Sequence, residues 1–145
     1  MPLTGMHHFS IRTEDVERST RFYVDVLGFT DGPRPPFDFP GAWLYQGDSA
    51  NPRNAIVHII GIDASSPQGL RAYMGDRDAR RELGTGPFDH MAFGGENLPE
   101  VRAQLDAHRV EFVERMVPML GLHQVFFKDP NGIMIELNFP ATEAA

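Results

Sequence analysis

Two parts of this chain carry the same order of elements at a nearly constant spacing. Residues 6–12 (MHHFSIR) and 88–94 (FDHMAFG) both have the character of a strand, and each leads through a polar residue into an amphipathic helix. Residues 54–62 (NAIVHIIGI) and 131–139 (NGIMIELNF) are predicted to contain the last strands of the two halves. The repeat indicates duplication of one small unit, so a fold built from two similar halves is expected.

Residue types that bind metals occupy matching positions in the two halves. His8 and His90 are 82 positions apart, and His58 and Glu136 are 78 positions apart. Because imidazole nitrogen and carboxylate oxygen are common metal ligands, this coincidence indicates one site shared between the halves.

The first half, residues 5–62, is predicted to be a strand, a helix and three further strands. Thr13 is a suitable cap for a helix over 14–27, and Gly28 is suited to end it. Residues 30–41 hold four prolines and two glycines, which favours a loop or an edge strand. Further strands are expected at 42–46 and 55–62.

The second half, residues 87–140, repeats this order after a linker at 63–86. Asn97 and Glu100 have capping-box spacing for its helix, and residues 129–132 (DPNG) are a strong tight-turn sequence. The short tail that follows this half is expected to fray. The strands of this half are expected at 89–94, 110–117, 122–128 and 133–139.

Composition excludes several classes of partner and site. The net charge of −7 argues against a nucleic-acid partner, since phosphate binding needs clustered Lys and Arg. No apolar stretch approaches the roughly 20 residues that span a bilayer, and the N-terminus does not resemble a signal peptide. Cysteine is absent, so any metal must be held by nitrogen and oxygen, and a cytoplasmic location is expected.

The candidate ligands fall on the strand faces opposite the apolar stripe. Side chains alternate across a strand, so a sheet covered by helices on one face points its other residues away from them. His58 and Glu136, for example, are flanked on both sides by apolar residues. If the second face curls into a cup, three imidazoles and one carboxylate converge. That donor set suits one Zn²⁺, Fe²⁺, Mn²⁺, Co²⁺ or Ni²⁺ ion with open positions for a substrate.

Three segments, 6–29, 88–105 and 126–139, resemble the vicinal oxygen chelate superfamily. Its members include glyoxalase I, bleomycin-resistance proteins, fosfomycin-resistance enzymes, methylmalonyl-CoA epimerase and extradiol dioxygenases. The resemblance implies that residues 1–145 are one α+β domain. In it, paired βαβββ modules form an open, cup-shaped mixed β-sheet barrel, with the helices outside, around one divalent metal. It also implies a small-molecule substrate and a homodimer, with the modules paired within one chain or across two copies.

His8, His90 and Glu136 match the usual ligand positions of that superfamily. His58 matches a fourth position, which in glyoxalase I carries a glutamate that serves as ligand and base. The resemblance therefore implies metal ligands at all four residues and a catalytic role for His58 and Glu136. Alternatively, His58 is a hydrogen-bonding neighbour of the ligands or a polar wall of the pocket. Histidine at this position argues against glyoxalase I activity itself.

Four further residues are candidates for the substrate side of the site. His123 is a candidate general acid or base, or an ordinary loop histidine. Arg12 either orients an anionic substrate or lies at the surface. Trp43 and Tyr45 either line the cup or pack at a module or subunit interface.

Three functions fit these residues. The first is a metal-dependent, glyoxalase-like enzyme of the lyase or isomerase type that acts on a small oxygen-chelating substrate. The second is an Fe(II) extradiol-type dioxygenase, for which the two histidines and the glutamate of the ligand set are also suited. The third is a non-catalytic drug-binding protein of the bleomycin-resistance kind. The aromatic residues favour that third function, and the retained metal ligands argue against it.

Overall fold

The computed structural model describes every residue except 1–3, 76–82, 87 and 145. The chain divides after residue 82 into two compact units, the first unit and the second unit, which are described separately. Part of the predicted linker at 63–86 lies outside the described residues. Within the described residues, no helix is long and apolar enough to cross a membrane.

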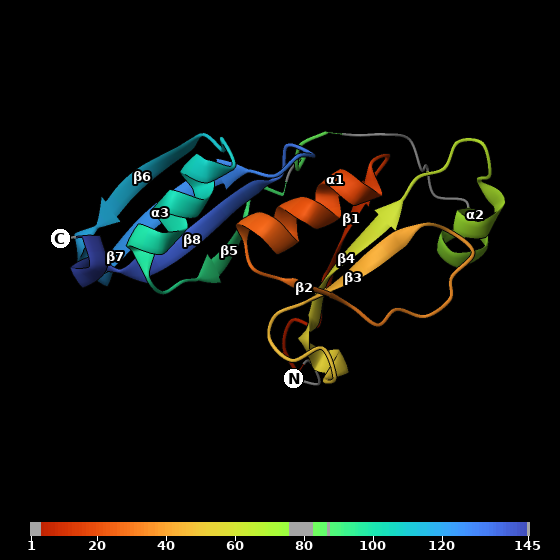
Figure 1. The fold of residues 1–145 in the computed structure, drawn as a ribbon, viewed down its shortest axis with the longest axis horizontal. Coiled ribbons are helices and arrows are strands. Elements are labelled where there is room, and N and C mark those ends of the chain that lie inside the picture. Colours follow the sequence, from red (N-terminus) through yellow and green to blue (C-terminus); the bar gives the residue numbers. More distant parts are fainter. Residues whose placement is uncertain (1–3, 76–82, 87, 145) are drawn as a thin grey trace. The chain divides into compact units, whose positions relative to one another are not determined.

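The first unit folds as a strand, a helix and three strands, followed by a second helix (Figure 1). Its strands are β1 (Phe9–Thr13), β2 (Thr30–Gly32), β3 (Gly41–Tyr45) and β4 (Ala55–Gly61). Its helices are α1 (Val16–Arg21), which continues as a π-helical turn (Phe22–Val26), and α2 (Gln68–Met74). A short 3-10 turn (Pro52–Asn54) precedes β4.

The second unit repeats the strand, the helix and the three strands. Its strands are β5 (Met91–Gly94), β6 (Phe112–Val117), β7 (Leu122–Lys128) and β8 (Met134–Pro140). Its helix is α3 (Leu98–Ala107), and 3-10 turns follow β6 (Pro118–Leu120) and β8 (Ala141–Ala144).

The two sheets have the same topology. Their strand orders are β1-β4-β3-β2 and β5-β8-β7-β6. In each sheet the first and last strands of the unit pair in parallel, and the other pairs are antiparallel. The predicted α+β fold with two βαβββ modules is therefore confirmed, and each sheet by itself is open. Within residues 30–41, Thr30–Gly32 form the short edge strand β2 and Gly41 begins β3, while the four prolines lie between the two strands, in accord with the composition of this stretch.

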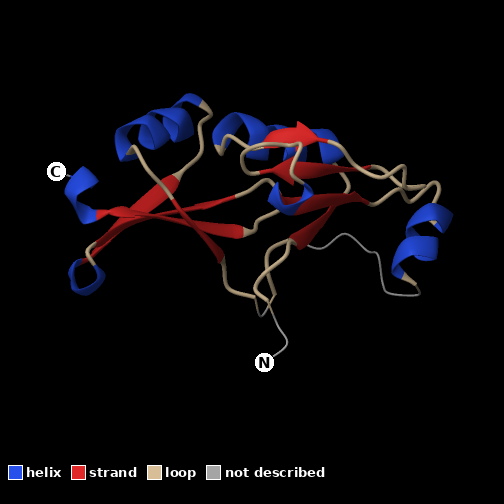
Figure 2. Ribbon diagram, turned by 90° about the horizontal axis from the view of Figure 1, so that it is seen from below, coloured by secondary structure: helices blue, strands red, loops and turns tan. Residues whose placement is uncertain are grey.

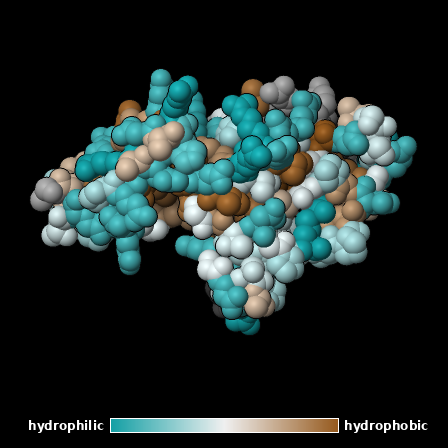
Figure 3. Space-filling view, viewed as in Figure 1, coloured by the Kyte–Doolittle hydropathy of each residue, from teal (hydrophilic) through white to brown (hydrophobic). Residues whose placement is uncertain are grey.

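One helix lies along one face of each sheet (Figure 2). In the first unit, α1 and its π-helical turn bury Ser19, Tyr23 and Val26. In the second unit, α3 buries Leu98 and Leu105, while its outer surface is mainly hydrophilic (Figure 3). The strands bury apolar side chains at alternate positions, as expected for a face covered by a helix. These residues are Ile11, Val57 and Ile59 in the first unit and Val125, Ile135, Leu137 and Phe139 in the second.

Strands β1 and β5 begin later than the sequence predicts, as do β6 and β8. The parallel ladders start at Phe9, which pairs with Val57, and at Met91, which pairs with Ile135. His8 and His90 therefore each lie one residue before a strand rather than within it. The equivalence of the two histidines is kept, because both occupy the same place relative to their sheets.

Helix α1 also begins later than predicted. Asp15, rather than Thr13, is its cap, because Asp15 Oδ1 accepts the backbone N–H of Arg18 at 3.0 Å. Thr13 remains the last residue of β1, and its hydroxyl oxygen accepts the N–H of Asp15 at 3.1 Å. Gly28, with φ of 77°, follows the helical segment as predicted.

The predicted tight turn at 129–132 is confirmed. Asp129 Oδ1 accepts the N–H of Asn131 at 2.8 Å and that of Ile133 at 2.9 Å. Gly132 has φ of 77°, a conformation that glycine adopts without steric cost. This turn fixes the register of β7 on β8, the two strands that carry Gln124 and Glu136.

Residues 141–144 of the tail are ordered, contrary to the expectation that the tail frays. Ala141–Ala144 form a 3-10 turn, in which Glu143 Oε2 accepts the N–H of Leu98 at 2.9 Å. Asn97 makes no cap bond with its side chain, which instead donates to Glu100 Oε2 at 2.6 Å, so the predicted capping box is wrong. A carboxylate from the far end of the sequence therefore satisfies the first N–H of α3.

Replacing Glu143 with Ala is expected to lower the free energy of unfolding by about 1 kcal/mol, because the N–H of Leu98 loses its acceptor. Urea denaturation of E143A beside the wild type measures this difference. Thr142→Ala, at an exposed position of the same turn, is the control and is expected to change stability by less than about 0.5 kcal/mol. Equal stability of both variants and the wild type would show that the tail does not cap α3.

Candidate functional site

In the second unit, two of the predicted ligands are in direct contact. His90 Nε2 lies 2.8 Å from Glu136 Oε2. Glu136 comes from the middle of β8 and is buried, with 7% of its surface exposed. It pairs with Ala92 of β5, two residues beyond His90, so the parallel ladder accounts for the contact.

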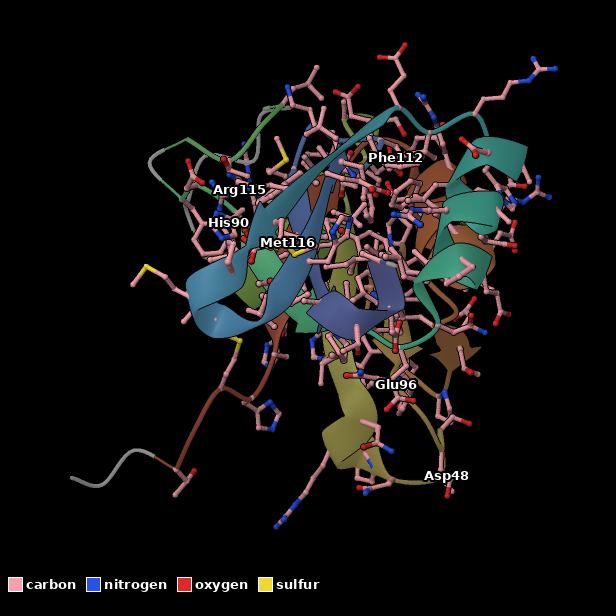
Figure 4. The ribbon with its side chains drawn as sticks, turned by 90° about the vertical axis from the view of Figure 1, so that its left-hand side faces the viewer. Asp48, His90, Glu96, Phe112, Arg115 and Met116 are labelled. Carbon is pink, nitrogen blue, oxygen red and sulfur yellow. The ribbon has the colours of Figure 1, made fainter. Side chains whose placement is uncertain are left out.

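The second oxygen of Glu136 is held by two amide groups. Glu136 Oε1 accepts a hydrogen bond from Gln124 Nε2 at 2.7 Å and another from Asn138 Nδ2 at 2.8 Å. Gln124 in turn accepts two hydrogen bonds from Arg115, on the same side of the unit as His90 (Figure 4). We call these residues, Gln124, Glu136, Asn138 and Arg115, the carboxylate network.

His90 lies between two carboxylates. Its Nδ1 is 2.6 Å from Asp89 Oδ2, while its Nε2 faces Glu136. The hydrogen bond to Asp89 and the charges of both carboxylates raise the pKa of His90 above its ordinary value. Both neighbours only accept hydrogen bonds, so this geometry stabilises the protonated ring and aligns Nε2 with Glu136.

In the first unit, the other two predicted ligands are stacked on one another. The rings of His8 and His58 are 4.0 Å apart with planes 15° from parallel. On its other face, His58 stacks on Trp43, at 4.2 Å and 10°. Trp43 and Ser10 are the residues that pair with His58 on the neighbouring strands. The register therefore fixes the position of His58 between two rings.

The tautomer of His58 follows from its hydrogen bond. His58 Nε2 lies 2.9 Å from the carbonyl oxygen of Ala55, which only accepts, so the ring proton is on Nε2. Burial, and then the charge of His8, lower the pKa of His58 to about 4. The ring is thus neutral near pH 7, and Nδ1 carries the free lone pair.

Each unit brings together one pair of the predicted ligands. Within either unit, the described residues contain no cluster of three or more His, Asp or Glu side chains arranged to hold a metal ion. The donor types nevertheless fit a divalent ion, because neutral imidazole and carboxylate are the groups that such ions prefer in proteins. Taken separately, the first unit offers the free Nδ1 of the neutral His58 ring, and the second offers the nitrogen of His90 and the oxygen of Glu136, which are donors of these types.

Two of the other predicted site residues, Arg12 and Tyr45, have different surroundings. Arg12 lies on the same face of its sheet as His58, since Arg12 pairs with Ile60 and Ser10 with His58. Tyr45 does not offer a wall to a ligand: it is 2% exposed, and its hydroxyl donates to the carbonyl of Pro33 at 2.6 Å. A register shift between Leu44 and Tyr45 breaks the alternation on which that expectation depended.

His123 lies on the face of the second sheet opposite Glu136. Alternation along β7 places its neighbour Gln124 with Glu136, so His123 points to the helix-covered side. There His123 Nε2 contacts Glu114 Oε2 at 2.9 Å, and Glu114 also binds Arg102 through both of its oxygens, at 2.6 and 2.8 Å. His123, predicted as a candidate general acid or base, therefore lies on the other face of the sheet from His90 and Glu136.

Asp89, Gln124, Asn138 and Arg115, which hold the predicted ligands in place, were not predicted as site residues from the sequence. Asp89 contacts His90, while Gln124 and Arg115 lead to Glu136. Only Asp89 carried a usable signal, because a carboxylate next to a candidate ligand is a frequent partner of metal-binding histidine. The amide and the guanidinium are recognised only once the register of β6 on β7 is known.

Comparison with known proteins gives the same family along almost the whole chain. The sequence profile of the Glyoxalase/Bleomycin resistance protein/Dioxygenase superfamily matches residues 5–137. Glyoxylase I 4 of Arabidopsis thaliana is 32% identical over 142 residues, which cover 93% of this chain and 70% of that protein. Protein YaeR of Escherichia coli (strain K12) is 26% identical, with 93% and 95% covered. The solved structure of glyoxalase I from Leishmania major is 21% identical, covers 98% of this chain and 91% of that one, and has a TM-score of 0.66.

The Arg102–Glu114–His123 group makes a prediction about acid stability. Hydrogen bonds from Arg102 and His123 lower the pKa of Glu114 from 4.5 to about 2. A lowered carboxyl pKa stabilises the fold above pH 4.5, and the contribution is lost as the pH falls through about 2. Because a quarter of the side chain is exposed, we expect E114Q to cost about 1 kcal/mol at pH 7.

Urea denaturation of E114Q and the wild type at pH 7 and pH 3 measures this dependence. The two proteins are expected to differ most at pH 7 and to differ less at pH 3, because part of the stabilisation is lost between pH 4.5 and about 2. Glu111→Gln, which changes an exposed glutamate just before the same strand, is the control. A difference that is constant with pH would contradict the assignment.

Proposed function

The chain belongs to the Glyoxalase/Bleomycin resistance protein/Dioxygenase superfamily, and on that premise we propose that it is a divalent-metal-dependent, glyoxalase-like enzyme of the lyase or isomerase type. Its proposed substrate is a small molecule that chelates through adjacent oxygens. The observation that carries the proposal is the 2.8 Å contact between His90 Nε2 and Glu136 Oε2, a nitrogen and an oxygen donor facing one another on a rigid sheet.

His8, His90 and Glu136 are the proposed metal ligands. Two imidazoles and one carboxylate leave open positions for substrate oxygens, and the ion proposed is Zn²⁺, Fe²⁺, Mn²⁺, Co²⁺ or Ni²⁺. A bound ion of this kind supplies a Lewis acid that stabilises negative charge on the oxygens of the substrate. The chain is also proposed to act as a homodimer.

His58 is proposed to move the proton in the reaction. Its Nε2–H is held by the Ala55 carbonyl, so Nδ1 is the atom that accepts a proton from the substrate carbon and returns it to the neighbouring carbon. Stacking of His8 and Trp43 on both of its faces prevents the ring from tilting. Arg12, on the same sheet face, is proposed to orient an anionic group of the substrate.

Metal binding is the first test. Protein purified without chelator and then reconstituted with metal is expected to hold about one equivalent of metal per site. His90→Ala is expected to lose the metal, because Glu136 is then the only ligand left of the His90–Glu136 pair. Metal analysis by mass spectrometry measures both, with His108→Ala, an exposed histidine on another face, as the control. Less than about a tenth of an equivalent in the wild type would refute the proposal.

Metal analysis, a ring-cleavage assay and a drug-binding assay together separate the proposed activity from its alternatives. Native iron, together with ring cleavage of a catechol under air, would assign the dioxygenase function instead. If His90→Ala binds a drug with the same affinity as the wild type, the non-catalytic drug-binding function would be assigned instead.

Replacement of His58 tests the proton transfer. His58→Gln is expected to lower kcat by about 100-fold or more, because the proton acceptor is lost, while metal affinity changes by less than about threefold. Calorimetric metal titration and turnover of an oxygen-chelating substrate measure the two quantities. If His58→Gln instead loses the metal, His58 is a fourth ligand and a different group moves the proton.

A further inference from the structure

We infer that Gln124 and Arg115 are positioning residues that present a single oxygen of Glu136, Oε2, to the metal. The inference rests on the metal site proposed above and specifies how one of its ligands is held. It is argued from contacts within the second unit alone.

Arg115 fixes which way the Gln124 amide points. Arg115 Nε and Nη2 lie 3.0 and 2.6 Å from Gln124 Oε1. A guanidinium only donates hydrogen bonds, so the amide oxygen must face Arg115 and the amide nitrogen must face the opposite way. Gln124 Nε2 consequently points at Glu136 and Asn138, at 2.7 and 2.9 Å.

The amide nitrogens then occupy one oxygen of the carboxylate. Glu136 Oε1 accepts from both Gln124 Nε2 and Asn138 Nδ2. A carboxylate oxygen has two lone pairs in its plane, so these two hydrogen bonds use both of them. Oε2, the oxygen that faces His90 Nε2, is the one available to an ion.

Burial and packing hold this arrangement rigid. Gln124 and Glu136 are both buried, and they lie on adjacent strands whose register is fixed by the tight turn between β7 and β8. The Arg115 guanidinium lies over the Phe126 ring, 5.3 Å from its centroid, and the same ring contacts His90 edge-on at 6.4 Å (Figure 4 labels Arg115 and His90). The Phe126 side chain therefore packs against both Arg115 and the ligand His90.

Loss of the Gln124 donor has two expected consequences. Glu136 Oε1 regains a lone pair, so the carboxylate can rotate and bind the ion through two oxygens. The ligand is also no longer pre-oriented, and loss of such a partner typically costs 10–100-fold in metal affinity.

The experiment is a calorimetric titration of Zn²⁺ into the apoprotein, with X-ray absorption of the Zn²⁺ form as a second readout. Gln124→Met is expected to weaken affinity by about 10–100-fold and to change the carboxylate from one bound oxygen to two. Arg115→Met is expected to weaken affinity in the same direction, and Arg115→Lys, which still donates to Gln124 Oε1, to restore it to within about threefold of the wild type. Arg102→Met, which removes the same charge from the other face of the unit, is the control.

The outcomes separate this inference from the proposed function. The metal site and the positioning role are both supported if Arg102→Met binds Zn²⁺ as tightly as the wild type while Gln124→Met and Arg115→Met bind it more weakly. Equal affinity of Gln124→Met and wild type, or two bound oxygens in the wild type, overturns the inference and leaves the metal site standing. A wild type that binds no Zn²⁺ overturns the metal site and the inference with it.

Discussion

The structure depends on the alternation of side chains across two open sheets, each covered by a helix on one face. Because one face of each sheet is buried against its helix, a shift of one residue in the pairing of any strand moves polar groups into the core. The register is therefore strongly specified. It is this constraint that places His58 beside Trp43 in the first unit, and Glu136 within reach of His90 and Gln124 in the second.

The duplicated units hold their candidate ligands by different interactions. In the first unit, His58 is held by stacked rings on both faces and a single hydrogen bond to backbone. In the second unit, Glu136 is held by the amides of Gln124 and Asn138, and Arg115 orients the Gln124 amide. A neutral ring tolerates an apolar setting, whereas a buried carboxylate needs donors for its lone pairs. The chemistry of each ligand thus dictates the kind of neighbours that it has.

The helix-covered face of the second sheet shows how the same rule limits function. His123, on that face, is bound to Glu114, which is bound to Arg102 of α3. These groups join the helix to the sheet, and the sheet itself separates them from the carboxylate network. A titratable residue on this face contributes to stability rather than to chemistry at Glu136.

The sequence predicts the two modules, the tight turn at 129–132 and the opposite faces of ligand and apolar residues, because these follow from local propensity and from alternation within a strand. It placed His58 and Glu136 correctly, since each is flanked by clearly apolar neighbours. It failed at His123, because both faces of β7 carry large apolar side chains and only pairing with β8 decides between them. It also failed at Tyr45, where a bulge breaks the alternation. The Arg115–Gln124 contact depends on the register of β6 on β7, and the cap on α3 comes from Glu143, 45 residues away. Neither could be predicted, because a hydrogen bond depends on distance in space, which no local sequence pattern encodes.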